Sequence, residues 1–395
     1  MPAKRSVNAG TQSEEKVEYF RLRDVITNTQ YGLSESLSDS GTVACLRMNN
    51  LDGGQIDSTD LKFVTLSSSV EASYLVRQND ILFNRTNSYA LVGKTALVDR
   101  PIKAVFASYL IRMEPDCSKI EPRYLAQLLI SEKWQAKIRA LATKGVSQSN
   151  INIQNLLRLQ IPVRPLKRQK IIADFLQSVD ASSSATQQIL SQLSRTKAAL
   201  MQGLLLPNPK TRTKFKVHAL GELFAERKES GKPGLPTLSV TMHDGMVDRE
   251  EHGRRVASEL TPEDHLLAHK HDIAYNMMRM WQGVSGLAPF KGLVSPAYVV
   301  LKPLAGIDPL FGSYLFKLPE TIRLFHRYSQ GLTNDRLRLY YDQFAEIRVP
   351  IPSDIKEQRR IASLLTTLDR QIEQSKSLVK SLRQTKAAIC QQLFS

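Results

Sequence analysis

The chain has 395 residues, a formal net charge of +16 at pH 7 and three cysteines. Its length allows two or three domains with separate cores, and the wide spacing of Cys45, Cys117 and Cys390 argues against a disulfide framework or a zinc knuckle. Residues 1–16 lack the apolar core of a signal peptide, and no later run reaches the roughly 20 apolar residues of a membrane span, so we expect a cytoplasmic protein without membrane association.

The positive charge is spread evenly along the chain. Residues 1–160, 161–205, 206–350 and 351–395 each carry a net charge of +4. An even distribution favours a long surface that faces a long polyanion such as duplex DNA, and it disfavours a single basic tail. A basic protein without a polyanionic partner is the alternative.

After a flexible tail over 1–16, residues 17–160 show the pattern of a mixed α+β domain. A strand at Asp80–Phe83 is followed by polar turn residues, and "AVFASYLIRM" (104–113) predicts one apolar strand. Residues 119–145 read as a helix that ends near Gly145, and a strand over 157–163 follows.

Residues 161–206 predict a long central helix. Apolar residues recur at spacings of four and three, the period of 3.5 that is typical of a coiled coil. The helix ends where Gly203 and Pro207 make continuation costly. The predicted seam of this helix consists of Ile172, Leu176, Val179, Leu190, Leu193 and Leu200.

The second half of the chain repeats the first. Residues 207–350 predict a second α+β domain, in which Asp272, Ile273 and Asn276 match Asp80, Ile81 and Asn84. Residues 351–395 predict a distal helix, and thirteen of the forty pairs that align 166–205 with 355–394 are identical, which indicates a duplication. The two helices can pair with each other, or with helices of another chain. The predicted seam of the distal helix consists of Ile361, Leu365, Leu368, Ile372, Val379, Leu382 and Ile389.

The doubled arrangement resembles the DNA-specificity (S) subunit of Type I restriction-modification enzymes. The resemblance rests on "RQKIIADFL" and "TKAALMQGLL" in the first helix and on "EQRRIASLL" and "TKAAICQQLF" in the second, and it extends from about Val17 onward. It implies an α+β fold with two similar target-recognition domains, separated by two long antiparallel coiled-coil helices and related by a pseudo-two-fold repeat.

The same resemblance implies partners and cofactors. Each domain would read one half of a split site in double-stranded DNA, and the helices would dock two methyltransferase (M) subunits, to which restriction (R) subunits attach. S-adenosylmethionine, ATP and Mg are then expected in the partner subunits and not in this chain.

Candidate DNA-reading residues are those whose side chains suit base edges or phosphates and that follow a predicted strand or helix. The alternatives are that Asn84 and Asn276 only cap turns, that Trp281 packs, and that the remaining residues are simply solvated. In the first domain the candidates are Asn84, Arg85, Thr86, Asn87, Ser88, Lys144, Ser147, Gln148 and Asn150. In the second domain they are Asn276, Arg279, Trp281, Gln282, Thr333, Asn334 and Arg336.

Several fragments imitate catalytic motifs without completing them. "LVGKT" (91–95) lacks the first glycine of a phosphate-binding loop, "PDCSK" (115–119) lacks the second acid-x-Lys element of a nuclease, and "PNP" (207–209) lacks the aromatic residue of an adenine methyltransferase. His265, His269 and His271 could ligate a metal, but a solvated helix is the favoured interpretation of 264–272. We therefore expect a non-catalytic subunit. The alternatives are a coiled-coil protein-protein adaptor without DNA readout and a DNA-processing enzyme.

Overall fold

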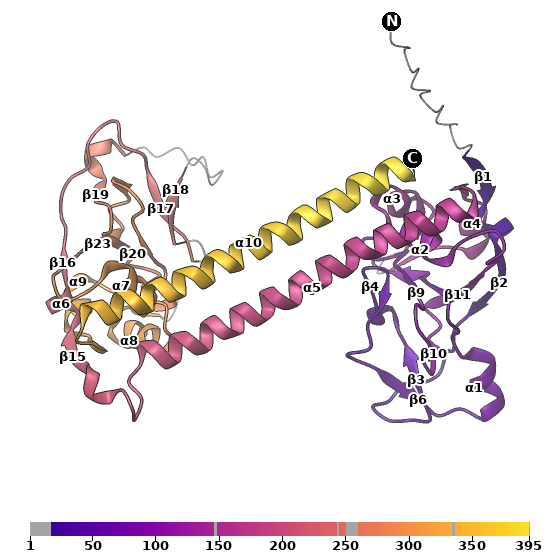
Figure 1. Ribbon diagram of the computed structural model, residues 1–395, viewed down its shortest axis with the longest axis horizontal. Coiled ribbons are helices and arrows are strands. Elements are labelled where there is room, and N and C mark those ends of the chain that lie inside the picture. Colours follow the sequence, from indigo (N-terminus) through magenta and orange to yellow (C-terminus); the bar gives the residue numbers. More distant parts are fainter. Residues whose placement is uncertain (1–16, 146–147, 243–244, 250–259, 334–335, 395) are drawn as a thin grey trace, which may run out of the picture. The chain divides into compact units, whose positions relative to one another are not determined.

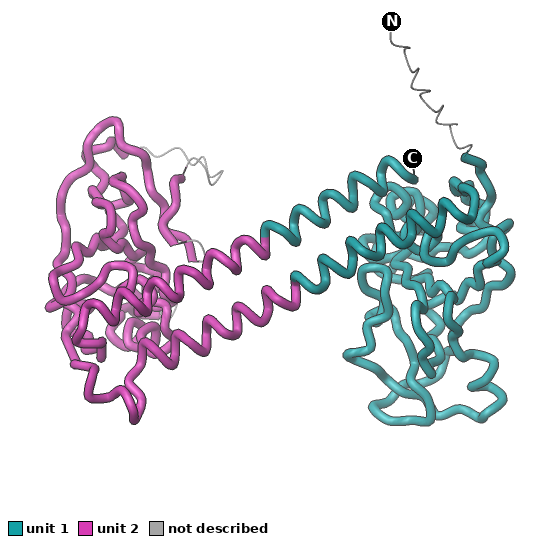
Figure 2. The backbone as a smooth tube through the Cα atoms, in the orientation of Figure 1, with its two compact units in different colours: residues 1–186, 377–395 teal, residues 187–376 magenta. Residues whose placement is uncertain are grey.

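The computed structural model describes residues 17–145, 148–242, 245–249, 260–333 and 336–394. These residues form two compact units. Unit 1 contains residues 1–186 and 377–395, and unit 2 contains residues 187–376 (Figure 2). Both long helices, α5 (Leu166–Leu205) and α10 (Ile355–Leu393), begin in one unit and end in the other (Figure 1).

Unit 1 is built on an antiparallel four-stranded sheet in the order β2-β11-β7-β9. A three-stranded sheet, β10-β3-β6, contains one parallel pair. The described part of the unit also contains a second three-stranded sheet, β12-β13-β8, and the two-stranded sheets β1-β14 and β4-β5. The strands are β1 (Glu18–Arg21), β2 (Ile26–Tyr31), β3 (Val43–Leu46), β4 (Leu51–Asp52), β5 (Gln55–Ile56), β6 (Lys62–Val64), β7 (Ile81–Asn84), β8 (Thr86–Asn87), β9 (Thr95–Leu97), β10 (Ala104–Phe106), β11 (Leu110–Pro115), β12 (Thr143–Lys144), β13 (Ser149–Asn150) and β14 (Gln160–Val163). Its short helices are η1 (Leu22–Val25), η2 (Met48–Asn50), α1 (Ser68–Tyr74), α2 (Pro122–Ile130), α3 (Glu132–Ala140) and α4 (Ile153–Leu157).

Unit 2 repeats this plan with an antiparallel sheet in the order β16-β23-β20-β21. Three two-stranded sheets, β15-β24, β17-β18 and β19-β22, surround it. The strands are β15 (Phe215–Ala219), β16 (Phe224–Glu226), β17 (Leu238–Val240), β18 (Met246–Asp248), β19 (Leu266–Ala268), β20 (Ile273–Asn276), β21 (Ser285–Leu287), β22 (Gly292–Val294), β23 (Tyr298–Pro303) and β24 (Arg348–Pro352). Its short helices are η3 (Arg212–Lys214), α6 (Leu220–Leu223), η4 (Pro262–Asp264), η5 (Met280–Gln282), α7 (Pro309–Leu315), α8 (Pro319–Tyr328) and α9 (Tyr341–Glu346).

The α+β class, the internal repeat and the two long helices agree with the sequence prediction, but two local predictions in unit 1 are wrong. The predicted single strand over 104–113 is two strands, β10 and β11, separated by a turn at Ala107–Tyr109, where Leu110 N donates to Ala107 O at 2.9 Å. The predicted helix over 119–145 is α2 followed by α3. It is interrupted at Ser131, whose hydroxyl donates to Leu128 O at 2.7 Å.

The long helices contribute directly to the core of each unit. In unit 1, Ile172 and Leu176 of α5 pack in the same buried cluster as Phe394, whose carbonyl accepts a hydrogen bond from Trp134 Nε1 at 3.0 Å. In unit 2, Ile361 and Leu365 of α10 belong to the buried core. Of the predicted seam, Ile172, Leu176, Ile361, Leu365, Leu368 and Val379 are buried, and Val179, Leu190, Leu193, Leu200, Ile372, Leu382 and Ile389 are partly buried.

Candidate nucleic-acid interface

In unit 1, a small three-stranded sheet brings two of the predicted polar stretches together. Strand β13 lies between β8 and β12, so Asn150 pairs with Thr86 on one side and with Thr143 on the other. Lys144, Gln148 and Asn150 are exposed on this sheet or beside it. Ser147 lies outside the described residues.

Asn84 and Asn276 occupy equivalent turns, one in each unit. Asn84 Oδ1 accepts a hydrogen bond from Thr86 N at 3.2 Å, and Asn276 Oδ1 accepts one from Met278 N at 2.9 Å. Asn84 is 0% exposed and Thr86 is 8% exposed, so neither side chain reaches the surface. In this structure Asn84 is therefore buried inside the loop, where its Oδ1 caps the turn, and its contact with DNA stays a prediction.

Cations and aromatic rings are interleaved around this loop of unit 1. The Arg85 guanidinium lies 5.1 Å from the centre of the Tyr31 ring, and Lys144 Nζ lies 4.5 Å from the centre of the Tyr89 ring. Tyr31, Tyr89 and Ser88 are exposed, and Arg85 and Asn87 are partly exposed. Cationic groups beside exposed rings can bind phosphates and stack on bases.

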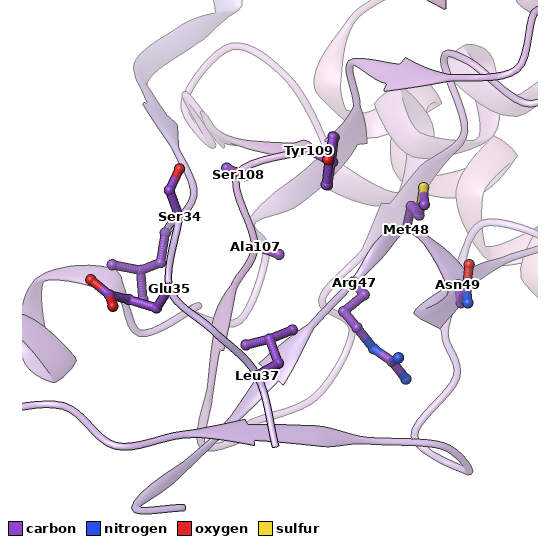
Figure 3. Close-up of a pocket in the computed structure, with 10 residues that line it drawn as sticks. Ser34, Glu35, Leu37, Arg47, Met48, Asn49, Ala107, Ser108 and Tyr109 are labelled. Atoms are coloured by element: carbon purple, nitrogen blue, oxygen red, sulfur yellow. The ribbon is translucent and has the colours of Figure 1, made fainter. Parts of the chain in front are cut away.

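A pocket of about 510 Å³ adjoins this loop. Figure 3 shows Arg47, Met48 and Asn49 on one side and Ser34, Glu35 and Leu37 on another, with Ser108 and Tyr109 between them. Arg85 N donates to Tyr109 O at 3.0 Å, which joins the pocket to the loop. Arg47 is oriented by Asp60, to whose Oδ2 it donates at 2.8 Å.

Sequence reasoning missed this pocket. Arg47, Asn49 and Tyr109 have side chains that suit base edges or stacking, but they come from separate segments that only the tertiary structure brings together. The local signal was the group of Arg47, Asn49 and Asn50 directly after an apolar strand.

In unit 2, the equivalent loop follows β20 and contains η5. Arg279 and Gln282 are exposed there. Trp281 is partly buried; its Nε1 donates to Met278 O at 2.9 Å and its ring lies edge-on to His326, with 6.0 Å between ring centres, which fits the packing interpretation.

The second predicted stretch of unit 2 lies beside this loop. Leu339 N donates to Met277 O at 3.0 Å, and Gln330 pairs with Arg338 in an antiparallel bridge. Thr333 and Arg336 are exposed, and Asn334 lies outside the described residues.

Each loop is followed by a glycine with a positive φ, and a side chain from the helical layer binds that glycine's carbonyl. In unit 1, Gln135 Nε2 donates to Gly93 O at 2.9 Å. In unit 2, Lys317 Nζ donates to Gly283 O at 2.8 Å and to Ser285 O at 3.0 Å. Burial, aided by the charge of Lys197, lowers the pKa of Lys317 to about 8. A neutral amide thus anchors the loop of unit 1, and a buried amine anchors the loop of unit 2.

Two equivalent buried acids hold the turns that precede these strands. Asp80 Oδ2 accepts from Arg77 N at 2.7 Å, and Asp272 Oδ2 accepts from His269 N at 2.8 Å. Burial raises the pKa of Asp80 to about 6, which outweighs the effect of Arg112, whose Nε lies 3.8 Å from the carboxylate. These acids have structural partners and no exposed face, so we assign them to loop support.

The histidine-rich segment does not form the helix that its sequence predicted. Residues Leu266–Ala268 are strand β19 because they pair with β22. His265 is buried with Nδ1 2.8 Å from Thr261 O, and His269 Nε2 lies 3.0 Å from Glu229 Oε2. Within the described part of the chain, no group of three or more His, Cys, Asp or Glu side chains could hold a metal ion. Nor is any described helix long and apolar enough to cross a membrane.

The sequence matches the model of one known protein family over most of its length. The model of the Type I restriction modification DNA specificity domain matches residues 14–195 and 269–383.

Two curated proteins illustrate the similarity. A Methanocaldococcus jannaschii protein assigned by name as the MjaX type I restriction enzyme specificity subunit is 29% identical over 209 residues, which are 52% of this chain and 49% of that protein. The EcoKI specificity subunit of Escherichia coli is 28% identical over 162 residues, 40% of this chain and 34% of that protein. The alignment thus spans about half of the first relative's length and a third of the second's.

Two solved structures share the fold. The S subunit of a Type-I restriction-modification system from M. genitalium superposes with a TM-score of 0.66 at 17% identity and covers 98% of both chains. A structure described as the basis of complex assembly and conformational transition of the type I R-M system gives a TM-score of 0.53 at 16% identity, covering 95% of this chain and 96% of that one.

Proposed function

The chain belongs to the family of Type I restriction modification DNA specificity domains, and from that premise we propose that it reads a split site in double-stranded DNA, one half with each unit. One observation carries the proposal most directly. The duplicated fold presents a polar loop at the same place in each unit, after β7 and after β20, and the two loops carry different side chains.

The chemistry of the loops fits DNA. In unit 1 the reading surface consists of Arg85, Asn87, Lys144 and the pocket around Arg47 and Tyr109, and in unit 2 it includes Arg279 and Gln282. Arginine suits guanine, and asparagine or glutamine suits adenine, so different residues at equivalent places specify different half-sites. The net charge of +16 supplies the attraction to phosphates that does not depend on sequence.

We assign methylation and cleavage to partner subunits and recognition to this chain. Two modification subunits would dock on α5 and α10, because each helix carries one copy of the duplicated segment, and restriction subunits would attach through them. S-adenosylmethionine, ATP and Mg would act in those subunits.

Loop substitutions in the complex of this chain with its modification subunit test the proposal. Changing Arg279 and Gln282 to alanine should relax recognition of one half-site, and changing Arg85 and Lys144 to alanine should affect only the other. Each lost bidentate base contact costs about 1–3 kcal/mol in discrimination. Binding to DNA libraries randomised in either half-site measures this, and a variant pair that alters both half-sites equally would contradict the division of labour.

A further inference from the structure

In unit 1 the helix α5 lies next to α2, and in unit 2 the helix α10 lies next to α7. We call these two surfaces the unit 1 face and the unit 2 face; they occupy equivalent positions of the repeat but differ in chemistry. On the unit 1 face, Arg123 of α2 lies against α5: its Nη1 donates to Asp174 Oδ1 at 2.6 Å and to Gln177 Oε1 at 2.9 Å. Arg123 Nε also donates to Glu121 Oε1 at 2.8 Å. The unit 1 face is therefore closed by ion pairs within the chain.

The ion pairs of Arg123 have no counterpart among the described residues of the unit 2 face. Leu310 of α7 stands where α2 has Arg123, and Ser363 and Thr366 of α10 stand where α5 has Asp174 and Gln177. A groove of about 650 Å³ opens between α7 and α10 in consequence. Two arginines of α10 line it, Arg359 and Arg370, at the positions that Lys170 and Ala181 occupy on α5.

The charges of the groove are unbalanced. Among the described residues, Asp308 is the one acid that lines it. Its side chain is already engaged: Oδ1 accepts from Phe311 N at 3.0 Å, and Oδ2 lies 3.6 Å from Arg359 Nε. The Arg370 side chain is exposed and makes no hydrogen bond or ion pair with another residue of the described part of the chain. The groove therefore presents a guanidinium without an acidic partner among these residues.

Building on the proposed function, we propose that this groove receives an acidic side chain of one modification subunit, with Arg370 as its main partner and Arg359 as the second. A carboxylate is the group that a guanidinium binds in bidentate geometry. On the unit 1 face, Arg123 pairs with Asp174, and Ala181 stands where α10 has Arg370, so the described residues there carry no guanidinium at the position equivalent to Arg370. Two copies of one partner subunit thus bind the two faces with unequal affinity.

The lining favours a protein segment over a DNA phosphate. Leu287, Leu310, Pro309 and Ala362 supply an apolar floor, which suits the aliphatic part of a glutamate or an adjacent apolar side chain.

Stepwise binding of the modification subunit to the full-length chain tests the proposal. Native mass spectrometry and titration calorimetry would compare wild type, Arg370→Glu, and the double variant Arg359→Glu/Arg370→Glu. The matched controls are Ala181→Glu and Lys170→Glu/Ala181→Glu, which place the same residues at the equivalent exposed positions of α5. Unchanged thermal unfolding would establish that each variant is folded.

We expect two unequal binding steps for wild type. Arg370→Glu should weaken one step about tenfold or more and leave a complex with one modification subunit at limiting concentration. The α5 controls should keep both steps.

Equal losses in both sets of variants, or no loss in Arg370→Glu, would overturn the inference and leave the proposed function standing. Weaker DNA binding with unchanged partner stoichiometry would assign the groove to DNA and also overturn it. A wild-type chain that binds no modification subunit would contradict the proposed function itself, and this inference with it.

Discussion

Gln169 and Gln358, at equivalent positions of the repeat, fasten each long helix to the domain that precedes it. Gln169 Oε1 accepts from Glu121 N at 2.8 Å, and its Nε2 donates to Lys119 O at 3.2 Å and Arg164 O at 2.7 Å. Gln358 repeats the pattern with Asp308 N at 2.9 Å, Gly306 O at 3.2 Å and Pro352 O at 2.9 Å. Both glutamines are buried, so these backbone groups have no water to replace the side chain.

Gln169→Leu should therefore destabilise unit 1 by about 2–4 kcal/mol, because it strands buried backbone groups while keeping the side-chain volume similar. Gln358→Leu should do the same in unit 2. Urea unfolding measures both, with Lys170→Leu at the adjacent exposed position as the control. Equal stabilities for Gln169→Leu and Lys170→Leu would show that the buried amide contributes nothing.

Lys317 makes the stability of unit 2 depend on pH. Its pKa in the folded state, about 8, lies below the ordinary value of 10.5, so the folded state binds this proton less tightly than the unfolded state does. Such a group contributes to the free energy of unfolding in full when the pH is above its pKa in the unfolded state. The contribution is lost as the pH falls through its pKa in the folded state.

Wild type should therefore gain free energy of unfolding relative to Lys317→Gln as pH rises from about 8 to about 10.5. Chemical denaturation at several pH values in this window measures the difference. Parallel pH profiles for the two proteins would mean that folding does not lower the pKa of Lys317.

For single residues, the sequence identified the exposed polar residues of the loops but not how their side chains are arranged. Asn84 has two interpretations in the sequence, because an asparagine after a strand can either cap a turn or face a ligand, and its burial is visible only in the structure. Arg47 and Tyr109 could not be found, because pairing between distant strands brings them together.

Among the secondary-structure elements, the two long helices, α5 and α10, could both be predicted from the repeat in the sequence. Two lysines at equivalent positions of the repeat, Lys197 and Lys386, form ion pairs between α5 and α10. Lys386 Nζ lies 2.7 Å from Asp180 Oδ1 in unit 1, and Lys197 Nζ lies 2.5 Å from Asp369 Oδ1 in unit 2. Each acid also binds its domain: Gln127 Nε2 donates to Asp180 at 2.8 Å, and Tyr314 Oη donates to Asp369 at 2.7 Å.

Reversing one charge in unit 1 should destabilise the helix pair, and reversing both should restore part of the loss. We expect Asp180→Lys to be the most destabilised variant and Asp180→Lys/Lys386→Asp to recover about 0.5–2 kcal/mol through the coupling of neighbouring charges. A double-mutant cycle measured by thermal unfolding gives this coupling, with Lys197 and Asp369 as the internal replicate. Strict additivity of the two changes would rule out the ion pair as a determinant of helix pairing.

The short elements were harder to predict than the helices, for physical reasons. The turn at Ala107–Tyr109 contains no glycine or proline, and Ser108 N there donates to Leu33 O, 75 residues away in the chain, at 2.7 Å. The break at Ser131 is equally unmarked, whereas its counterpart in unit 2 carries Pro319 at the start of α8, a signal that could have been used.

For the whole molecule, the proposed reading of a split DNA site explains why the duplicated chain contains two long helices. A site made of two separated halves needs two readers and an element that sets their spacing, and each half of this chain supplies one of each. The helices have 40 and 39 residues.

If the helices set the spacing of the DNA half-sites, lengthening both should change it. Inserting one heptad near Ser183 and one near Ile372 preserves the 3.5-residue period and adds about 10 Å to each helix. The preferred spacer should grow by up to about three base pairs, with lower affinity because the half-sites also rotate about the DNA axis. Methylation of sites with identical half-sites and graded spacers measures this, and an unchanged preference in a folded, partner-bound variant would contradict it.

The most direct test of the central claim is a genome-wide map of DNA methylation in cells that express this chain with its modification subunit. We predict a single new motif with two specified parts separated by a fixed number of unspecified bases, and we expect Arg279→Ala/Gln282→Ala to change one part only. A continuous motif, or a methylation pattern that does not depend on which chain accompanies the modification subunit, would contradict it.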